Sequence, residues 1–282
     1  MLAVALAVGS AVSWGLADFL GGLQSRRLAV LSVLLASQGT GLLVAAALVI
    51  GTGEAMPELG ELLPAILAGV AGAAALGAFY AGLAIGTMSI VAPISATGAA
   101  LPVIVGIATG DRPSALALAG IAAAIAGVVL ASREAHDDER RAADARRGVL
   151  LALVAAAGFG AALVAFDAAA EHGVAWTLLA SRCTSVPLIA LAIVLARPGT
   201  SRKPGPADLP TLALVGVLDV GANGLYALAA TQGLLSVVGV LGSLYPVATV
   251  VLARAVLGER VRRTQEAGIV LALGGVGLIA AG

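Results

Sequence analysis

Charged side chains inside the apolar segments of this chain are the residues whose types could do chemistry. Asp18, Arg182 and Asp219 lie in runs made mainly of leucine, alanine and valine. An ionisable group deep in a lipid bilayer costs about 2.5–3.5 kcal/mol on insertion scales, so each one needs a partner or a function. Carboxylates in this setting can carry protons, and a buried guanidinium can hold an anion. The sequence therefore points to proton or substrate binding inside a membrane.

The spacing around two of these charges favours polar helix faces. Asp219, Asn223 and Tyr226 follow i, i+4, i+7 spacing, which places them within about 60° of one another around a helix. Trp14 and Asp18 have the same i, i+4 relation. We expect both faces to line a shared central cavity.

A repeated heptapeptide relates Arg182 to Gln38. LLASQGT occupies 34–40 and LLASRCT occupies 178–184, with glutamine and arginine at the same position. Arg182 is too deep to snorkel comfortably, so it needs a carboxylate or an anionic substrate. Either it forms a structural salt bridge with Asp219, or the two line a substrate or proton pathway. For Asp18 the alternative to a functional role is a helix-end carboxylate paired with Arg26 or Arg27.

Aromatic residues are few, and five of them occur at related places in the two halves. We interpret them as walls of a pocket rather than as an interfacial belt. The candidate substrate-binding residues are Trp14, Asp18, Gln38, Tyr80, Phe159, Arg182, Asp219, Asn223, Tyr226 and Tyr245, and the candidates for proton coupling are Asp18 and Asp219.

Composition identifies the class of protein that must position these side chains. Of 282 residues 60% are hydrophobic and 11% charged, with mean hydropathy +1.05, which is more apolar side chain than one soluble core can bury. The net charge is zero and no basic stripe with aromatics is present, which excludes a nucleic-acid binder. Neither histidine has a second ligand at metal-binding spacing, so we predict no metal and no cofactor.

The fold we predict is an all-α membrane protein with ten transmembrane helices. A spanning helix needs about 20 apolar residues. The expected spans are 2–22, 28–50, 62–84, 88–109, 114–132, 148–170, 174–196, 209–230, 234–256 and 264–281. The polar tract 133–147 is the expected linker between a first five-helix unit at 1–132 and a second at 148–282.

The two units repeat one pattern. Besides the heptapeptide, Ser13-Trp14-Gly15 matches 158–160, Tyr80-Ala81 matches 226–227 and Ser89-Ile90-Val91 matches 236–238, at offsets of 144 to 147. An odd number of spans per unit makes the second enter the bilayer from the opposite side, which predicts inverted repeats. We expect the buried charges to face each other across the seam between the two units.

Prolines and glycines distinguish two equivalent pairs of helices. Pro93 and Pro102 in helix four and Pro246 in helix nine are expected to bend these helices, which suggests a mobile or binding element. Helices five and ten are rich in glycine and alanine and carry no internal charge. We expect these helices to pack closely within the chain, and a homodimer formed through them is a further hypothesis.

Basic residues predict how the chain is oriented. Of 16 lysines and arginines, all but Arg112 and Arg182 lie in or beside the loops after helices 1, 5, 7 and 9. Since cytoplasmic loops carry an excess of Lys and Arg, this places the linker in the cytoplasm and both termini outside.

These features together resemble the EamA-type module of the drug/metabolite transporter superfamily. The resemblance rests on Trp14-Gly15, on the stretch from Tyr226 to Pro246, and on LGERV at 257–261 followed by Gln265 and Gly268. It implies a ten-helix carrier of a bacterial-type plasma membrane with a central cavity. Where the second unit has Gly258-Glu259-Arg260, the first has Gly110-Asp111-Arg112. The family habit of cytoplasmic termini disagrees with the charge rule.

The function we expect is secondary active transport, with export as the expected direction, of small metabolites, amino acids or drug-like compounds. We expect it to work by alternating access coupled to protons or ions. The alternatives are a flippase for lipid-linked substrates, which a lateral opening would favour, and an intramembrane enzyme, for which no catalytic histidine lies in a span. We expect Glu259 to pair with neighbouring arginines at the interface and assign it no catalytic role.

Overall fold

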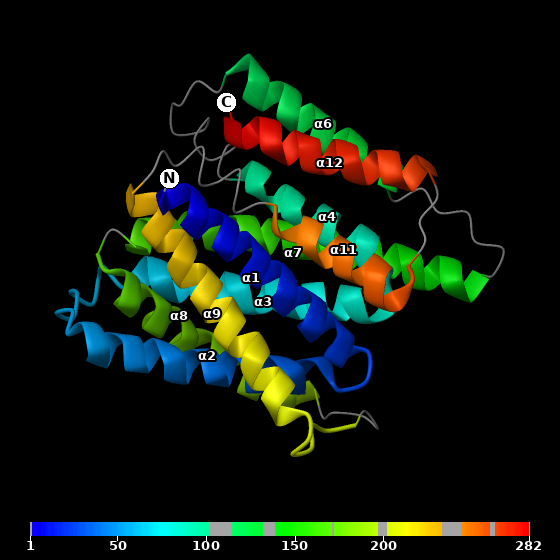
Figure 1. Cartoon of the computed structure of the whole chain (residues 1–282). Coiled ribbons are helices and arrows are strands. Elements are labelled where there is room, and N and C mark those ends of the chain that lie inside the picture. The colour runs from blue at the N-terminus through cyan, green and yellow to red at the C-terminus, as the bar shows by residue number, and fades with distance from the viewer. Residues whose placement is uncertain are drawn as a thin grey trace.

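A computed structural model describes residues 2–101, 114–131, 139–170, 172–196, 202–232, 244–259 and 263–281. Within these ranges the regular structure is helical and contains no strand (Figure 1), which confirms the all-α prediction for this part of the chain. Six of the described helices are long and apolar enough to cross a membrane. These are α1, α2 and α3 in the first half and α7, α8 and α9 in the second.

The helices follow the chain in two series. The first series is α1 (Leu2–Ser25), α2 (Val30–Thr52), α3 (Leu63–Ile85), α4 (Met88–Ala96) with the 3₁₀ turn η1 (Thr97–Ala99), and α6 (Ala115–Ala131). The second series is α7 (Glu139–Ala170), α8 (Val174–Ala196), α9 (Leu209–Gln232), α11 (Tyr245–Leu257) and α12 (Arg263–Ala281).

Three expected elements differ from the structure. The α-helical part of helix four ends at Ala96 and continues as a 3₁₀ turn, and the rest of that span lies largely outside the described residues. The expected helix 234–256 is not continuous, because Leu244 is in a turn and α11 begins at Tyr245. Pro246 therefore does not bend a helix. It lies in the first turn of α11, where the missing N–H has no helical partner to lose.

The linker also differs from its prediction. Helix α7 begins at Glu139, so that residues 139–147 of the expected polar linker form the first turns of a helix that continues to Ala170. Residues 139–147, ERRAADARR, combine alanine with arginine and glutamate, all of which favour helix even where no apolar face is buried. Residues 132–138 lie outside the described part of the chain.

Contacts between the two series come in matched pairs. Helix α1 packs on α9 as α7 packs on α3, α3 packs on α8 as α9 packs on α2, and α1 packs on α11 as α7 packs on α4. Three further contacts join equivalent helices: α2 with α8, α4 with α11, and α6 with α12, which lie side by side in Figure 1. These contacts of the first series on the second thus have counterparts in the other direction, whereas the contact of α4 with α12 has none among the larger contacts of the described helices. The described helices therefore associate with a two-fold pattern.

Close contact between α9 and α2 depends on one glycine. A Cβ added at Gly216 would lie 2.9 Å from the Cβ of Thr40 and closer still to the carbonyl oxygen of Ser37. Ser37 and Thr40 belong to the first copy of the repeated heptapeptide. Only a residue without a side chain lets the two backbones approach this closely.

The second copy of the heptapeptide makes the same contact. A Cβ at Gly69 of α3 would lie 2.8 Å from the Cβ of Thr184 and 2.5 Å from the carbonyl oxygen of Ser181. In each copy, the serine and threonine of Ser-x-x-Thr therefore contact a glycine from the third helix of the other half. This packing accounts for the repetition of serine and threonine in the sequence.

We predict that a side chain at Gly216 weakens the packing of the two halves against each other. Gly216→Val should lower the stability of the folded protein by about 1–3 kcal/mol, the usual cost of overpacking a filled interface. Gly221→Val is the matched control, because the same helix would carry the same β-branched residue at a site with nothing within 4 Å of the added Cβ. The measurement is the thermal unfolding midpoint of each variant in detergent. Equal midpoints for the two variants would contradict the assignment.

Candidate functional site

The carboxylate of Asp219 is the centre of the candidate site. Its Oδ2 oxygen accepts a hydrogen bond from Nε2 of Gln38 at 3.1 Å and another from Nη2 of Arg182 at 2.7 Å. Gln38 lies on α2 and Arg182 on α8, at equivalent positions of the repeated heptapeptide. At this position, one of two at which the copies differ, both copies of the motif direct a side chain at a single oxygen atom on α9.

The contact at Asp219 is buried, and its partners correct one expectation about the seam between the two halves. The side chains of Arg182 and Asp219 are 11% and 17% exposed, and Gln38 is 4% exposed. Removing either ionic partner would strand the other in a poorly solvated setting. Arg182 and Asp219 both belong to the second half, so their ion pair does not cross the seam as expected. The residue that crosses it is Gln38, an amide.

Arg182 retains unused hydrogen-bonding capacity. Its Nε is buried and has no hydrogen-bond partner. A guanidinium offers five N–H donors, and the ion pair with Asp219 uses Nη2. Nε lies close to Gly41 of α2. A Cβ at Gly41 would lie only 3.2 Å from Nε, so the glycine leaves room for the guanidinium. A buried donor without a partner is the kind of group that an anionic ligand can satisfy.

Asp18 joins the same region from α1. The residue is 8% exposed, and it lies near enough to Asp219 for the two carboxylates to interact electrostatically. The alternative pairing at the helix end is wrong, because Arg26 pairs with Glu259 and Arg27 donates to Gln24. Within the described part of the chain Asp18 has no ion pair with any cation.

Aromatic rings from three helices pack together, and one of them lies near Asp18. The ring of Trp14 on α1 lies 5.6 Å from that of Tyr226 on α9 and 6.2 Å from that of Tyr245 on α11, centroid to centroid. Tyr245 is within electrostatic range of Asp18. The structure therefore brings together three of the aromatic residues singled out in the sequence, each from a different helix.

Tyr80 and Phe159 lie outside the cluster of Trp14, Tyr226 and Tyr245 in the ring contacts that the structure gives. The hydroxyl of Tyr80 donates to the backbone oxygen of Ala17 at 3.5 Å, and its position is within electrostatic range of Asp18 and Asp219. Phe159 packs on Phe79 at 5.6 Å, and Phe79 in turn packs on Tyr80. Phe159 is thus joined to the carboxylates only through two intervening rings in the contacts that the structure gives.

Asn223 has a more local role than its spacing suggested. Its Nδ2 donates to the backbone carbonyl of Asp219 at 2.7 Å, one turn earlier on the same helix. The amide therefore supports the backbone that carries the carboxylate. Among the described residues no group of three histidine, cysteine or acidic side chains could hold a metal ion.

Glu259 makes a set of contacts that the sequence did not reveal. Its carboxylate accepts hydrogen bonds from the backbone N–H groups of Met88 and Ser89 and from Oγ of Ser89, at 3.0–3.2 Å, and pairs with Arg26 at 3.0 Å. It therefore caps the first turn of α4 from the other half of the chain. Arg26 also donates to the carbonyl oxygens of Leu83 and of Gly86.

These contacts extend the expectation for Glu259. In the described part of the chain the arginine that pairs with it is Arg26, from the first half. The only signal in the sequence was that LGERV and the Ser-Ile-Val start of helix four both stood out as motifs. Nothing in their spacing could show that one caps the other.

We predict that charge balance at Asp219 matters more than charge itself. Arg182→Gln should destabilise the protein by about 3–5 kcal/mol, the cost of stranding one partner of a buried ion pair. Arg182→Gln combined with Asp219→Asn should recover most of the loss, since three amides can then hydrogen bond as a neutral group. Thermal midpoints of both single variants and the double variant in detergent measure this coupling. Additive losses would show that Arg182 and Asp219 do not stabilise each other.

Comparison with known proteins identifies the family of the chain. The model of the EamA-like transporter family matches residues 1–133 and 146–281, one match in each half. A crystal structure described only as that of a protein superposes with a TM-score of 0.66 at 18% sequence identity, covering 98% of this chain and 95% of that chain. At this identity the likeness shows the fold alone. No curated protein matches the chain. On the family match, which confirms the resemblance in the sequence, the chain belongs to the EamA-like transporter family.

Proposed function

We propose that this protein is a secondary active transporter that exports small metabolites, amino acids or drug-like compounds by alternating access. In this proposal ten helices span a bacterial-type plasma membrane as two inverted five-helix repeats. The linker lies in the cytoplasm, as the distribution of basic residues predicts. The observation that carries the proposal is the buried carboxylate of Asp219, held by equivalent residues of both halves.

The packing of the halves supports this mechanism. In two of the matched contacts, α1 with α9 and α3 with α7, the helices run antiparallel. Ala7 and Ser10 of α1 lie beside Ala229 and Ala222 of α9, respectively. In the same way Gly82 and Ala75 of α3 lie beside 148 and 158 of α7. Such a two-fold arrangement lets one set of helices rock against the other around a fixed site, which is how inverted repeats alternate access.

The site itself suggests the class of substrate. Arg182 has a buried donor without a partner beside the Asp219 carboxylate, and three aromatic rings pack together, one of them within electrostatic range of Asp18. A ligand with one anionic group and one apolar or ring-shaped portion matches both features. An amino acid with an apolar side chain is the simplest molecule of this kind.

Asp18 is the group we assign to ion coupling. Asp219 keeps a cation beside it in Arg182, whereas Asp18 has none in the described part of the chain. A buried carboxyl that lacks a cation can bind and release a proton as the site changes its access to water. Its proximity to Asp219 couples that proton to whatever occupies the Arg182 side of the site.

Closure at one end completes the proposal. The contacts of Glu259 with Arg26 and the first turn of α4 join the two halves at the end of the bundle where α1 and α3 finish. We propose that this connection closes the site on that side in the present conformation and opens when access alternates.

The test of coupling uses purified protein in proteoliposomes. A thermal-shift screen of amino acids and small metabolites first finds a stabilising ligand, and a pH-sensitive dye then reports proton movement when that ligand is added. Asp18→Asn should still bind the ligand yet abolish the proton movement. Asp219→Asn should weaken binding instead, because it releases Arg182 and Gln38. Proton movement that persists in Asp18→Asn would remove this residue from the coupling mechanism.

The same vesicles separate the carrier from a flippase. A fluorescent lipid placed in one leaflet should stay there when the protein is active on its small-molecule ligand. Movement of the lipid between leaflets, without ligand transport, would favour the flippase.

The closing contact can be tested through backbone amides. Glu259→Ala should speed hydrogen exchange at the start of α4, since the N–H groups of Met88 and Ser89 lose their acceptor, and Glu259→Gln should have a smaller effect because an amide oxygen still accepts. Glu61→Ala is the control: Glu61 pairs with His172 beyond the other end of α3. Exchange measured by mass spectrometry on peptides covering 87–92 should change only in the Glu259 variants. Equal exchange in all variants would show that Glu259 does not hold α4.

A further inference from the structure

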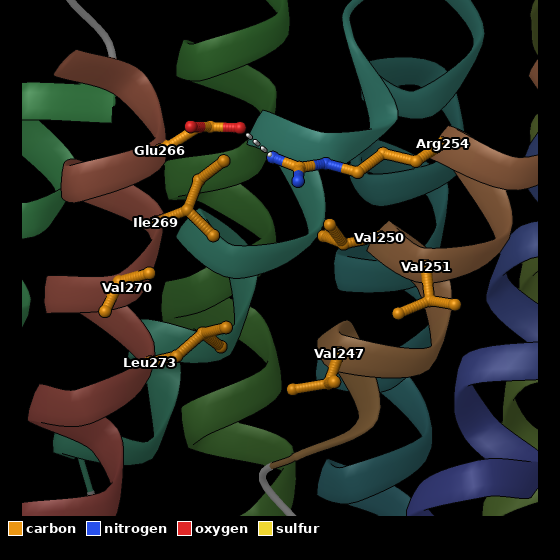
Figure 2. Close-up of a pocket in the computed structure, with 8 residues that line it drawn as sticks. All are labelled: Val247, Val250, Val251, Arg254, Glu266, Ile269, Val270 and Leu273. Atoms are coloured by element: carbon orange, nitrogen blue, oxygen red, sulfur yellow. Dashed lines mark hydrogen bonds and ion pairs between the residues drawn. The ribbon is translucent and has the colours of Figure 1, made fainter. Parts of the chain in front are cut away.

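A groove between α11 and α12 is the feature of the surface that transport leaves unexplained. It encloses about 340 Å³, and three valines of α11 face three aliphatic residues of α12 across it (Figure 2). Arg254 and Glu266 form an ion pair at 3.0 Å across one end. None of the residues that line it belongs to the site around Asp219.

The walls of the groove face outward. Helix α11 packs on α1 and α4, and α12 packs on α6 and α4, so the groove runs between two helices that share α4 as a neighbour. Val251 and Val270 in its walls are 58% and 70% exposed. In a protein of this hydropathy, an exposed aliphatic surface of this kind meets the hydrocarbon of the bilayer.

The length of the groove suits part of an acyl chain. Its lining runs from Val247 to Arg254 on α11 and from Glu266 to Leu273 on α12. Seven residues of helix rise about 10 Å, which is about a third of the roughly 30 Å hydrocarbon core. The apolar part therefore reaches from the Arg254 end into one leaflet without crossing to the other.

The polar end favours an anionic headgroup. Arg254 and Glu266 are 42% and 45% exposed, so their pair is a weak one that leaves most of the guanidinium donors free. Arg263, exposed in the first turn of α12, adds a second cation at this end. Glu259, the other acidic residue described nearby, already accepts four hydrogen bonds from Arg26, Met88 and Ser89.

We propose that this groove is a binding site for one anionic phospholipid. One acyl chain lies between the aliphatic walls of α11 and α12, and the phosphate accepts hydrogen bonds from Arg254. The lipid is bound rather than transported, since the groove shares no lining residue with the site around Asp219. The inference does not depend on the transport mechanism.

Two substitutions test the two parts of the site. Val251→Trp fills the groove, and its matched control is Val256→Trp, since Val256 is another valine of α11, 60% exposed, that does not line the groove. Arg254→Gln removes the donor for the phosphate while keeping a side chain of similar reach. Native mass spectrometry of the full-length protein in detergent, titrated with phosphatidylglycerol or phosphatidylcholine, counts the bound lipids and gives their affinities.

The wild-type chain should retain one phosphatidylglycerol more tightly than phosphatidylcholine. Val251→Trp should weaken that binding about tenfold, a change of about 1.4 kcal/mol, and Val256→Trp should not alter it. Arg254→Gln should reduce the preference for phosphatidylglycerol over phosphatidylcholine. Unchanged phosphatidylglycerol binding in Val251→Trp, or equal binding of the two lipids by the wild type, would overturn the proposal. So would a wild-type dimer that Val251→Trp converts to a monomer, because a second copy would then be the occupant.

Discussion

The carboxylate of Asp219 is the constraint on which the arrangement of the central helices depends. A charge in this setting must have donors, and they come from α2 and α8 at 3.1 Å and 2.7 Å. Because Gln38 and Arg182 sit at equivalent positions, satisfying one oxygen of Asp219 fixes two helices of the two halves relative to α9. Close packing and charge satisfaction thus place the same three helices.

Residues repeated in both halves and residues found in one half have different roles in this structure. Glycine contacts are made from each half to the other, by Gly216 on Ser37 and by Gly69 on Ser181, so they hold the halves together with a two-fold pattern. The charges occur once: Arg182 replaces Gln38, and Asp219 has no counterpart carboxylate in α3. The repeated residues are sufficient to pack the two halves together. The charges without a counterpart are not needed for this packing, which is why we assign ligand and proton binding to them.

Much of the architecture followed from local properties of the sequence. Runs of about 20 apolar residues give helices α1, α2, α3, α8 and α9 within a few residues of their expected ends, since length and hydropathy suffice to define a spanning segment. Helix boundaries failed where local propensity and tertiary packing decided together. Pro246 starts a helix instead of bending one. Helix α7 begins nine residues early, at Glu139 rather than 148, in a polar stretch with high helix propensity.

By itself, the sequence determined the class of protein, the repetition of its halves and the identity of the residues that need partners. Hydropathy and the cost of charge in lipid are local quantities, so these features can be seen without coordinates. Only the tertiary structure decided which partners these residues have. It showed that Gln38 rather than Arg182 reaches Asp219 across the seam, that Asp18 stands apart from Arg26 and Arg27, and that Glu259 caps α4. The reason is physical: pairing depends on distances between helices that lie 37 to 181 or more residues apart in the chain, and no local pattern encodes those distances.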